Sequence, residues 1–165
     1  MAYWKGGLIT ELAEDEIFVF GSNPEGRHGA GSAKAALAFG AVYGVGRGLS
    51  GQTYALVTVN LKAGYTEPNG TCYLKAGPKS VSLVHIVKNL RELKSVAKTC
   101  PEKKFLVAYT YGDYNRNGYS DNEMAMAFVA AKLPDNVLLH ESFEEEINKI
   151  LERRSRWLAS NQTKI

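Results

Sequence analysis

The stretch IFVFGSNPEGRHGAGSAKAALAFG, residues 17–40, decides the fold class of this protein. It opens with apolar β-branched and aromatic residues at 17–20, between acidic residues and Gly21, which is typical of a buried strand. Residues 32–39 are rich in strong helix formers, and Gly40 suits the end of a helix. The stretch therefore predicts a strand, a glycine-rich loop and a helix in direct succession.

The same alternation of strands and helices continues along the chain. Apolar runs predict further strands, and amphipathic or alanine-rich patterns predict further helices. The strands are expected at 54–59, 104–109 and 136–139, and the helices at 80–98, 121–131 and 142–158. Residues 62–79 are rich in Gly, Pro and Asn, which favours an ordered loop or hairpin outside the core. Alternating strands and helices indicate an α/β fold with a mainly parallel sheet that is covered on both faces.

Length and composition limit the function classes. A chain of 165 residues is expected to form a single domain, 1–165, and its net charge of +3 argues against a function dominated by electrostatics. Cys72 and Cys100 lie far apart without a histidine cluster, so we expect free thiols and no metal site. The sequence has no apolar run long enough for a membrane span, and acidic residues near its N-terminus argue against a signal peptide. We therefore expect a cytoplasmic protein without membrane contact.

The loop after the first predicted strand has the features of an anion-binding site. Four of its eleven residues, 21–31, are glycine, which lets the backbone approach a ligand, and the following helix offers unpaired N–H groups. A merely tight turn is the alternative. Ligand contacts are expected from Gly21, Ser22, Asn23, Arg27, Gly29, Ala30 and Gly31. A formal GxGxxG match at 46–51 follows a helix and precedes a strand, which is the wrong order for a dinucleotide site.

Two side chains of this loop are candidates for catalysis. Asn23 could hydrogen-bond a sugar hydroxyl through both of its amide groups, or it could form an Asx turn before Pro24. His28 could bind phosphate or transfer a proton near neutral pH, although a loop histidine is often simply solvated.

A second polar loop, residues 110–120, is expected at the same edge of the sheet. Ligands bind at the carboxyl ends of strands in such sheets, and both loops leave a strand there. Asp113 is the carboxylate best placed to polarise a water, and the aromatic rings could cover an adenine or a ribose. A solvated turn is the alternative. Ligand contacts are expected from Tyr111, Gly112, Tyr114 and Asn115.

Over roughly residues 16 to 140, the chain resembles a family of small macro-domain-like proteins of bacteriophages and bacteria. The resemblance is carried by GSNxxGRHGAG followed by GxGxGLxGQxYA within residues 21–55. It implies a three-layer α/β fold with a mixed, mostly parallel sheet flanked by helices. It also implies that Asn23 contacts the distal ribose of ADP-ribose, and that Gly29, Ala30 and Gly31 lie against the diphosphate or that ribose. Relatives commonly have a compact IGCGLAG-like second loop, whereas this chain has the longer, more polar TYGDYNRNG.

Macro domains bind ADP-ribose; some remove it from modified proteins or nucleic acid, and others hydrolyse its 1″-phosphate. The resemblance therefore implies an ADP-ribosyl glycohydrolase or ADP-ribose 1″-phosphatase that needs no cofactor and acts in the cytoplasm, or in the host cytoplasm if a phage encodes it. Asn23 would orient the sugar, and Asp113 or His28 would activate water.

The altered second loop motivates an alternative: a non-catalytic protein that binds or sequesters an ADP-ribose-like nucleotide, for example to counter bacterial immune signalling. A third possibility is a macro fold that serves only as an interaction surface, with Trp157 on a docking helix at 142–158.

Overall fold

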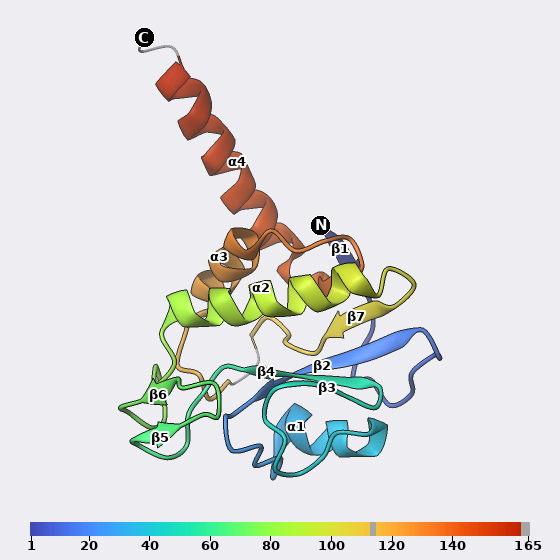
Figure 1. Ribbon diagram of the computed structural model, residues 1–165. Helices are drawn as coiled ribbons and strands as arrows, with labels where there is room; N and C mark the ends of the chain where they lie inside the picture. The colour runs from blue at the N-terminus through green and yellow to red at the C-terminus, as the bar shows by residue number, and fades with distance from the viewer. Residues whose placement is uncertain (113–114, 163–165) are drawn as a thin grey trace.

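The computed structural model describes residues 1–112 and 115–162, which form a three-layer α/β fold around one six-stranded sheet (Figure 1). The strands follow the order β1-β8-β7-β2-β4-β3 across the sheet. They are β1 (Ala2–Trp4), β2 (Glu16–Ser22), β3 (Gly48–Ser50), β4 (Thr53–Val57), β7 (Lys104–Val107) and β8 (Val137–His140). Every neighbouring pair is parallel except β3 and β4. The prediction of a mainly parallel sheet is therefore confirmed.

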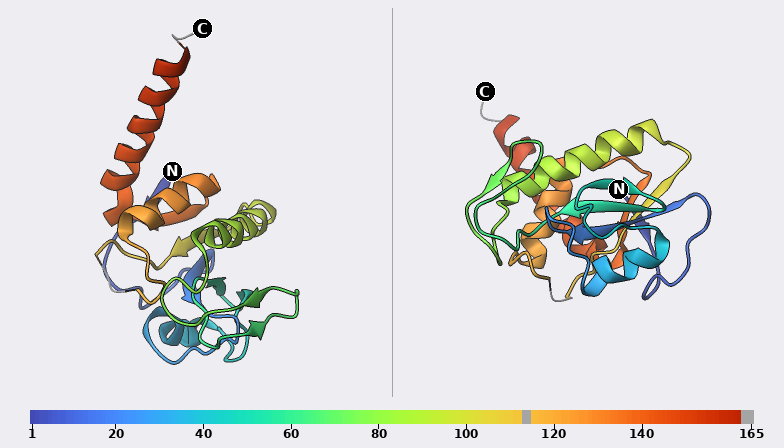
Figure 2. Two further views of the ribbon diagram at one scale, coloured as in Figure 1. Left: turned by 90° about the vertical axis from the view of Figure 1, so that its left-hand side faces the viewer. Right: turned by 60° about the horizontal axis from the view of Figure 1, so that its bottom comes forward.

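Helices cover both faces of this sheet (Figures 1 and 2). One face carries α1 (Gly31–Ala36), which a 3₁₀ turn, η1 (Leu37–Phe39), extends. The opposite face carries α2 (Leu83–Thr99) and α3 (Asp121–Ala131); η2 (Glu141–Phe143) and α4 (Glu144–Gln162) follow β8. The apolar core is divided accordingly into a smaller cluster beneath α1 and a larger one beneath α2 and α3.

The helix boundaries follow local capping signals. The Ser120 hydroxyl accepts a hydrogen bond from the backbone of Glu123, whose carboxylate accepts one from the backbone of Ser120, so α3 begins at Asp121 as predicted. The Ser82 hydroxyl caps α2 by accepting a hydrogen bond from the backbone N–H of His85, and the helix therefore starts three residues after the predicted 80. The helix predicted at 142–158 begins as the 3₁₀ turn η2 and continues as α4 to Gln162.

Two strands of the sheet and one small hairpin complete the fold. Strands β1 and β3 have three residues each, too few for a periodic signal in the sequence. The first, β1, pairs in parallel with β8, more than a hundred residues later in the chain. Strands β5 (Tyr65–Thr66) and β6 (Cys72–Tyr73) form the hairpin excursion expected within 62–79.

Candidate functional site

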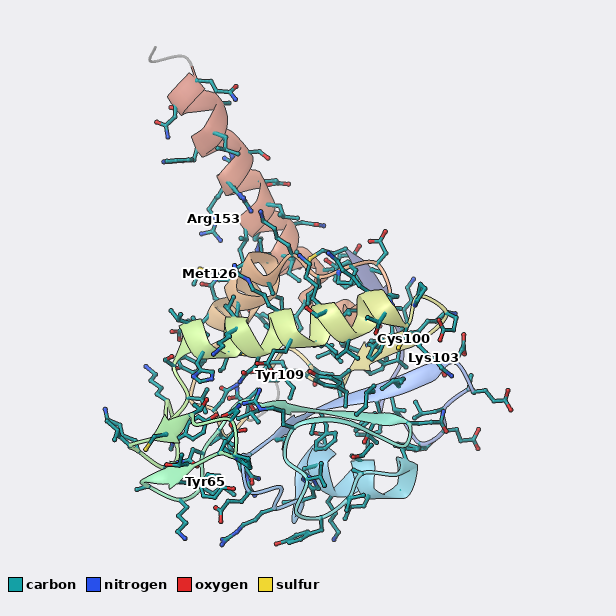
Figure 3. All side chains as sticks on the ribbon, in the orientation of Figure 1. Tyr65, Cys100, Lys103, Tyr109, Met126 and Arg153 are labelled. Atoms are coloured by element: carbon teal, nitrogen blue, oxygen red, sulfur yellow. The ribbon has the colours of Figure 1, made fainter. Side chains whose placement is uncertain are left out.

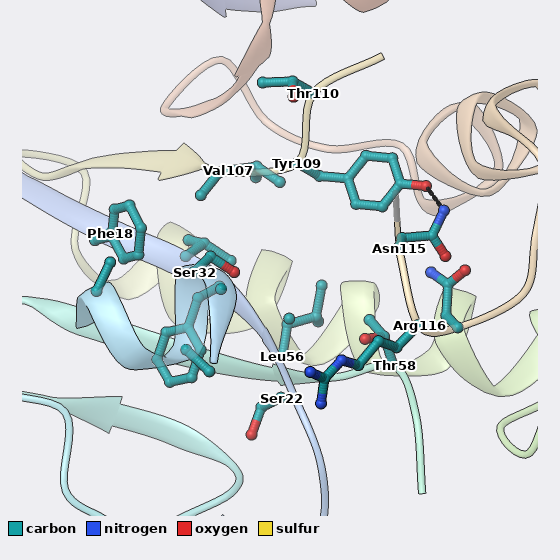
Figure 4. Close-up of a pocket in the computed structure, with 18 of the residues that line it drawn as sticks. Phe18, Ser22, Ser32, Leu56, Thr58, Val107, Tyr109, Thr110, Asn115 and Arg116 are labelled. Atoms are coloured by element: carbon teal, nitrogen blue, oxygen red, sulfur yellow. Dashed lines mark hydrogen bonds between the residues drawn. The ribbon is translucent and has the colours of Figure 1, made fainter. Parts of the chain in front are cut away.

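A cavity of about 1000 Å³ lies at the carboxyl ends of β2 and β7, two adjacent parallel strands (Figure 4). Phe18, Leu56 and Val107 line it from the sheet. The glycine loop, residues 21–31, borders the cavity on one side, and Thr110, Asn115 and other residues of the polar loop border it on another. Small-molecule sites are typically about 300–1000 Å³, so this cavity is large enough for a nucleotide. The structure thus brings the two loops together at one sheet edge.

The cavity gathers many, but not all, of the predicted ligand-binding residues. Those that line it are Gly21, Ser22, Asn23, Arg27, Ala30, Gly31 and Asn115. Those that are described but do not line it are His28, Gly29, Tyr111 and Gly112. Asp113 and Tyr114 lie outside the described residues. Asp113 is one of the two candidates, with His28, for the activation of water.

Tyr111 and Gly112 anchor the polar loop instead of lining the cavity. The Tyr111 ring packs edge-on against Phe143, with 5.6 Å between the ring centroids, and its N–H donates to Ser142 Oγ at 2.9 Å. The N–H of Gly112 donates to an oxygen of Asp121 at 3.1 Å. The Tyr111 ring is therefore not placed to cover an adenine or a ribose in the cavity, as the sequence led us to expect.

The side chain of His28, a residue of the glycine loop, is buried and does not line the cavity. It is only 1% exposed and packs edge-on against Phe20, with 5.1 Å between the ring centroids. Nε2 lies 2.9 Å from the carbonyl oxygen of Val45, which can only accept, so Nε2 carries the proton and donates it. This position favours a structural role for His28 over the catalytic one, because the imidazole does not reach the ligand space.

Asn23 closes the glycine loop with both ends of its amide. Oδ1 accepts a hydrogen bond from the N–H of Arg27, and Nδ2 donates to the Arg27 carbonyl, each at 3.0 Å. The side chain is 5% exposed, although the residue borders the cavity. Asn23 therefore holds the loop in shape, which is close to the Asx-turn alternative.

Gly26 of this loop and Gly46 permit a close contact between two backbone segments. A Cβ on Gly26, whose φ is +69°, would lie 2.4 Å from the nitrogen of Val45, and a Cβ on Gly46 would lie 2.1 Å from the oxygen of Asn23. The Gly44 N–H also donates to the Gly26 carbonyl at 2.8 Å. The GxGxxG match at 46–51 thus begins at a packing partner of the glycine loop. Of the glycines in this loop, Gly21 and Gly31 border the cavity and remain available for a ligand.

Two arginines bring positive charge to the cavity from opposite loops. Arg27 belongs to the glycine loop, and Arg116 to the polar loop, where Figure 4 shows its guanidinium directed into the cavity. Arg27 also lies 3.4 Å from Glu25. Asp and Glu are missing from the described cavity lining. Arginine pairs well with phosphate, so the charge of the site favours an anionic ligand.

The N-terminal segment forms a wall that the sequence did not indicate. Trp4 donates its indole N–H to the carbonyl of Val107 at 2.9 Å, and residues 6–9 line the cavity. His140 packs edge-on against Trp4, and its Nε2 lies 2.8 Å from the carbonyl oxygen of Gly6. Its Nδ1 lies 2.7 Å from Ser142 Oγ. No local pattern could predict this wall, since His140 and Gly6 are 134 residues apart.

A cluster around Arg47 lies beside the cavity without lining it. Arg47 forms a bidentate ion pair with Glu67, with Nε–Oε2 and Nη2–Oε1 distances of 2.9 and 2.7 Å. Its Nη1 contacts Glu92 Oε2 at 2.7 Å and Asn89 Oδ1 at 3.0 Å. The Tyr73 hydroxyl donates to Glu67 as well. These contacts join the β5–β6 hairpin, helix α2 and the segment that packs on the glycine loop.

Glu67 makes the stability of this cluster depend on pH. Burial acts to raise the pKa of Glu67, but the hydrogen bonds from Arg47 and Tyr73 together with the positive charge of Arg47 outweigh it, and the pKa is lowered. A carboxylate with a lower pKa in the folded state stabilises the fold above its unfolded pKa and loses that contribution as the pH falls through its folded pKa. In urea unfolding at several pH values, the stability advantage of the native protein over Glu67→Gln should be largest near neutrality and shrink below the ordinary value of 4.5. An advantage that stays constant into acid would contradict this assignment.

Within residues 1–112 and 115–162, no group of three or more His, Cys, Asp or Glu side chains is placed to hold a metal ion. The helices of the same residues all lack the combination of length and apolar character that crossing a bilayer requires.

Comparisons with protein-family models, curated proteins and solved structures found no match to this chain.

Proposed function

We propose that this protein binds a nucleotide of the ADP-ribose type in the cavity between the glycine loop and the polar loop. The observation that carries the proposal is the meeting of these two loops, each with one arginine, around a cavity of about 1000 Å³. Such a nucleotide combines an aromatic base, ribose hydroxyls and a diphosphate. The lining offers groups suited to each.

Arg27 and Arg116 are the groups suited to the diphosphate. They approach from opposite loops, so a diphosphate between them would meet charge on both sides. Ala30 and Gly31 border the same space. Apolar residues such as Phe18 and Leu56 provide surface for the base, and Thr58 provides a hydroxyl group.

Binding is better supported than hydrolysis by the residues that can be placed. His140 is the one imidazole in the described cavity lining, and both of its ring nitrogens have partners, at Gly6 and Ser142. The Asn23 amide is likewise engaged by the backbone of Arg27. Hydrolysis of an ADP-ribosyl bond or of ADP-ribose 1″-phosphate would therefore depend on Asp113.

Isothermal titration calorimetry with ADP-ribose tests this proposal. Ala30 lines the cavity and has an extended backbone, with φ −156° and ψ 165°, so Ala30→Trp can place an indole there without backbone strain. We expect the native protein to bind and Ala30→Trp to lose at least about 100-fold in affinity, equivalent to about 2.7 kcal/mol. The matched control is Ala38→Trp, because Ala38 is exposed and does not line the cavity.

The outcomes separate the alternatives. If the native protein releases no binding heat, or if Ala30→Trp binds as well as Ala38→Trp, the proposal is wrong. Incubation with ADP-ribosylated protein, ADP-ribosylated DNA and ADP-ribose 1″-phosphate then separates a binder from an enzyme. Turnover of any of the three that Ala30→Trp abolishes and Ala38→Trp retains would assign hydrolysis to the same cavity.

A further inference from the structure

The ion pair between Arg47 and Glu67 joins two segments that each pack against one of the cavity loops. Neither residue belongs to the described lining of the cavity. Figure 3 shows Tyr65 on the β5–β6 hairpin, which carries Glu67 between its two strands. The pair is bidentate and the Glu67 side chain is buried, so the contact is geometrically specific and only weakly screened by water. Such a pair holds its two segments in one relative position.

On one side of the pair, Arg47 ends a short segment that packs on the glycine loop. We call residues 44–47 the backing segment. The Gly26 carbonyl accepts a hydrogen bond from the first N–H of this segment at 2.8 Å. The Ser22 hydroxyl donates to one of its carbonyls, also at 2.8 Å. These two contacts lie on the part of the glycine loop that leads to Arg27, so the backing segment supports the position of that arginine.

On the other side of the pair, Glu67 belongs to the hairpin whose continuation packs on the polar loop. The chain runs from β6 into residues 78–81. There the N–H of Lys79 donates to the carbonyl of Asn117 at 2.7 Å. Asn117 directly follows Arg116 in the chain. The hairpin therefore supports the position of the second arginine.

We propose that Arg47 is a positioning residue: through its ion pair with Glu67 it holds the glycine loop and the polar loop together, so that Arg27 and Arg116 face one ligand. The link between the loops is a property of the free protein, whereas its consequence for the ligand rests on the proposed function. Without the pair, the backing segment and the hairpin can separate. The two guanidinium groups then lose the preorganisation that lets them act on the same diphosphate.

Hydrogen exchange of the ligand-free protein tests the link between the loops. The reporters are the N–H groups of Arg27 and Lys79, which are hydrogen-bonded in the glycine loop and against the polar loop. Glu67→Gln keeps the size of the side chain and removes the charge that the pair needs. If opening of either loop breaks the pair, the substitution speeds exchange at both reporters by a common factor of at least about tenfold. Both should exchange faster than the N–H of Phe105, which is bonded within the sheet and reports global unfolding.

Glu102→Gln is the matched control for the exchange measurement. It removes the same charge from an exposed site, and it should leave both rates within about twofold of the native ones. Acceleration at only one of the two reporters would overturn the link, because it would show that the loops open independently. Equal acceleration by Glu102→Gln would overturn it as well.

Calorimetry with ADP-ribose tests the consequence for the ligand. We expect Glu67→Gln to weaken binding about tenfold and Glu102→Gln to bind like the native protein. In an Arg116→Ala background, Glu67→Gln should weaken binding by at most about threefold, because the pair acts through the relative position of the two arginines. Arg47→Lys keeps the charge without the bidentate contact, so it should show an intermediate loss and serves if Glu67→Gln does not fold.

The two measurements separate this inference from the proposed function. If the native protein binds ADP-ribose but Glu67→Gln weakens binding equally with and without Arg116, the positioning role is wrong and the proposed function stands. If the native protein does not bind, the proposed function is wrong. A common acceleration of exchange at Arg27 and Lys79 would then still establish that the pair links the two loops.

Discussion

Replacing Arg47 by leucine is expected to lower the free energy of unfolding by about 3–5 kcal/mol. The substitution removes the cation from Glu67, whose side chain is only 5% exposed, and leaves a buried carboxylate without its bidentate partner. It also breaks the connection between the β5–β6 hairpin and α2, because Arg47 contacts Glu92 and Asn89 on that helix. Urea unfolding at neutral pH measures the loss.

Two further variants separate the ion pair from a general effect of lost charge. Lys98→Leu removes one positive charge from an exposed site of α2 and should change the stability by no more than about 0.5 kcal/mol. Arg47→Lys keeps the charge but cannot form the planar bidentate contact, so its loss should be intermediate. If Arg47→Leu costs no more than Lys98→Leu, the cluster has no structural importance.

Replacing Gly46 by alanine is expected to destabilise the protein by about 3 kcal/mol or more, at the upper end of the cost of overpacking. The added Cβ would lie 2.1 Å from the Asn23 oxygen and 2.8 Å from the Pro24 oxygen. Both neighbours are backbone atoms, so the clash can be relieved only if the glycine loop moves away. We therefore also expect the variant to bind ADP-ribose more weakly in calorimetry.

Gly29→Ala is the matched control within the glycine loop. A Cβ there meets nothing within 4 Å and faces no positive φ, so the stability should change by no more than about 0.5 kcal/mol. Equal stability losses for Gly29→Ala and Gly46→Ala in urea unfolding would show that glycine content, and not the contact between the two segments, governs this loop.

Local sequence patterns predicted the main elements and the layer architecture because their signals are short-range. The apolar run before Gly21 predicted β2, the helix formers after Gly31 predicted α1 and its 3₁₀ extension, and Ser120 marked the start of α3. Parallel strands align their carboxyl ends, so the meeting of the two loops at one edge also followed from the order of the elements.

The sequence could not predict which side chains face the cavity at that edge, because their positions depend on contacts between distant residues. His28 turns inward because Val45 offers an acceptor beneath the loop, and Gly26 serves packing because the segment around Gly46 lies against it. Arg116 was overlooked as a site residue, since nothing in its neighbourhood distinguishes a guanidinium that enters the cavity from one in solvent.

By itself, the sequence determined the main strands, loops and helices, although not the three-residue strands β1 and β3, since periodicity, capping and glycine placement are local properties of the chain. The tertiary structure alone decided which loop side chains face the cavity and how β1 and His140 close its wall. Burial and hydrogen bonding of a side chain depend on segments far away in sequence, and only the folded chain brings those segments together.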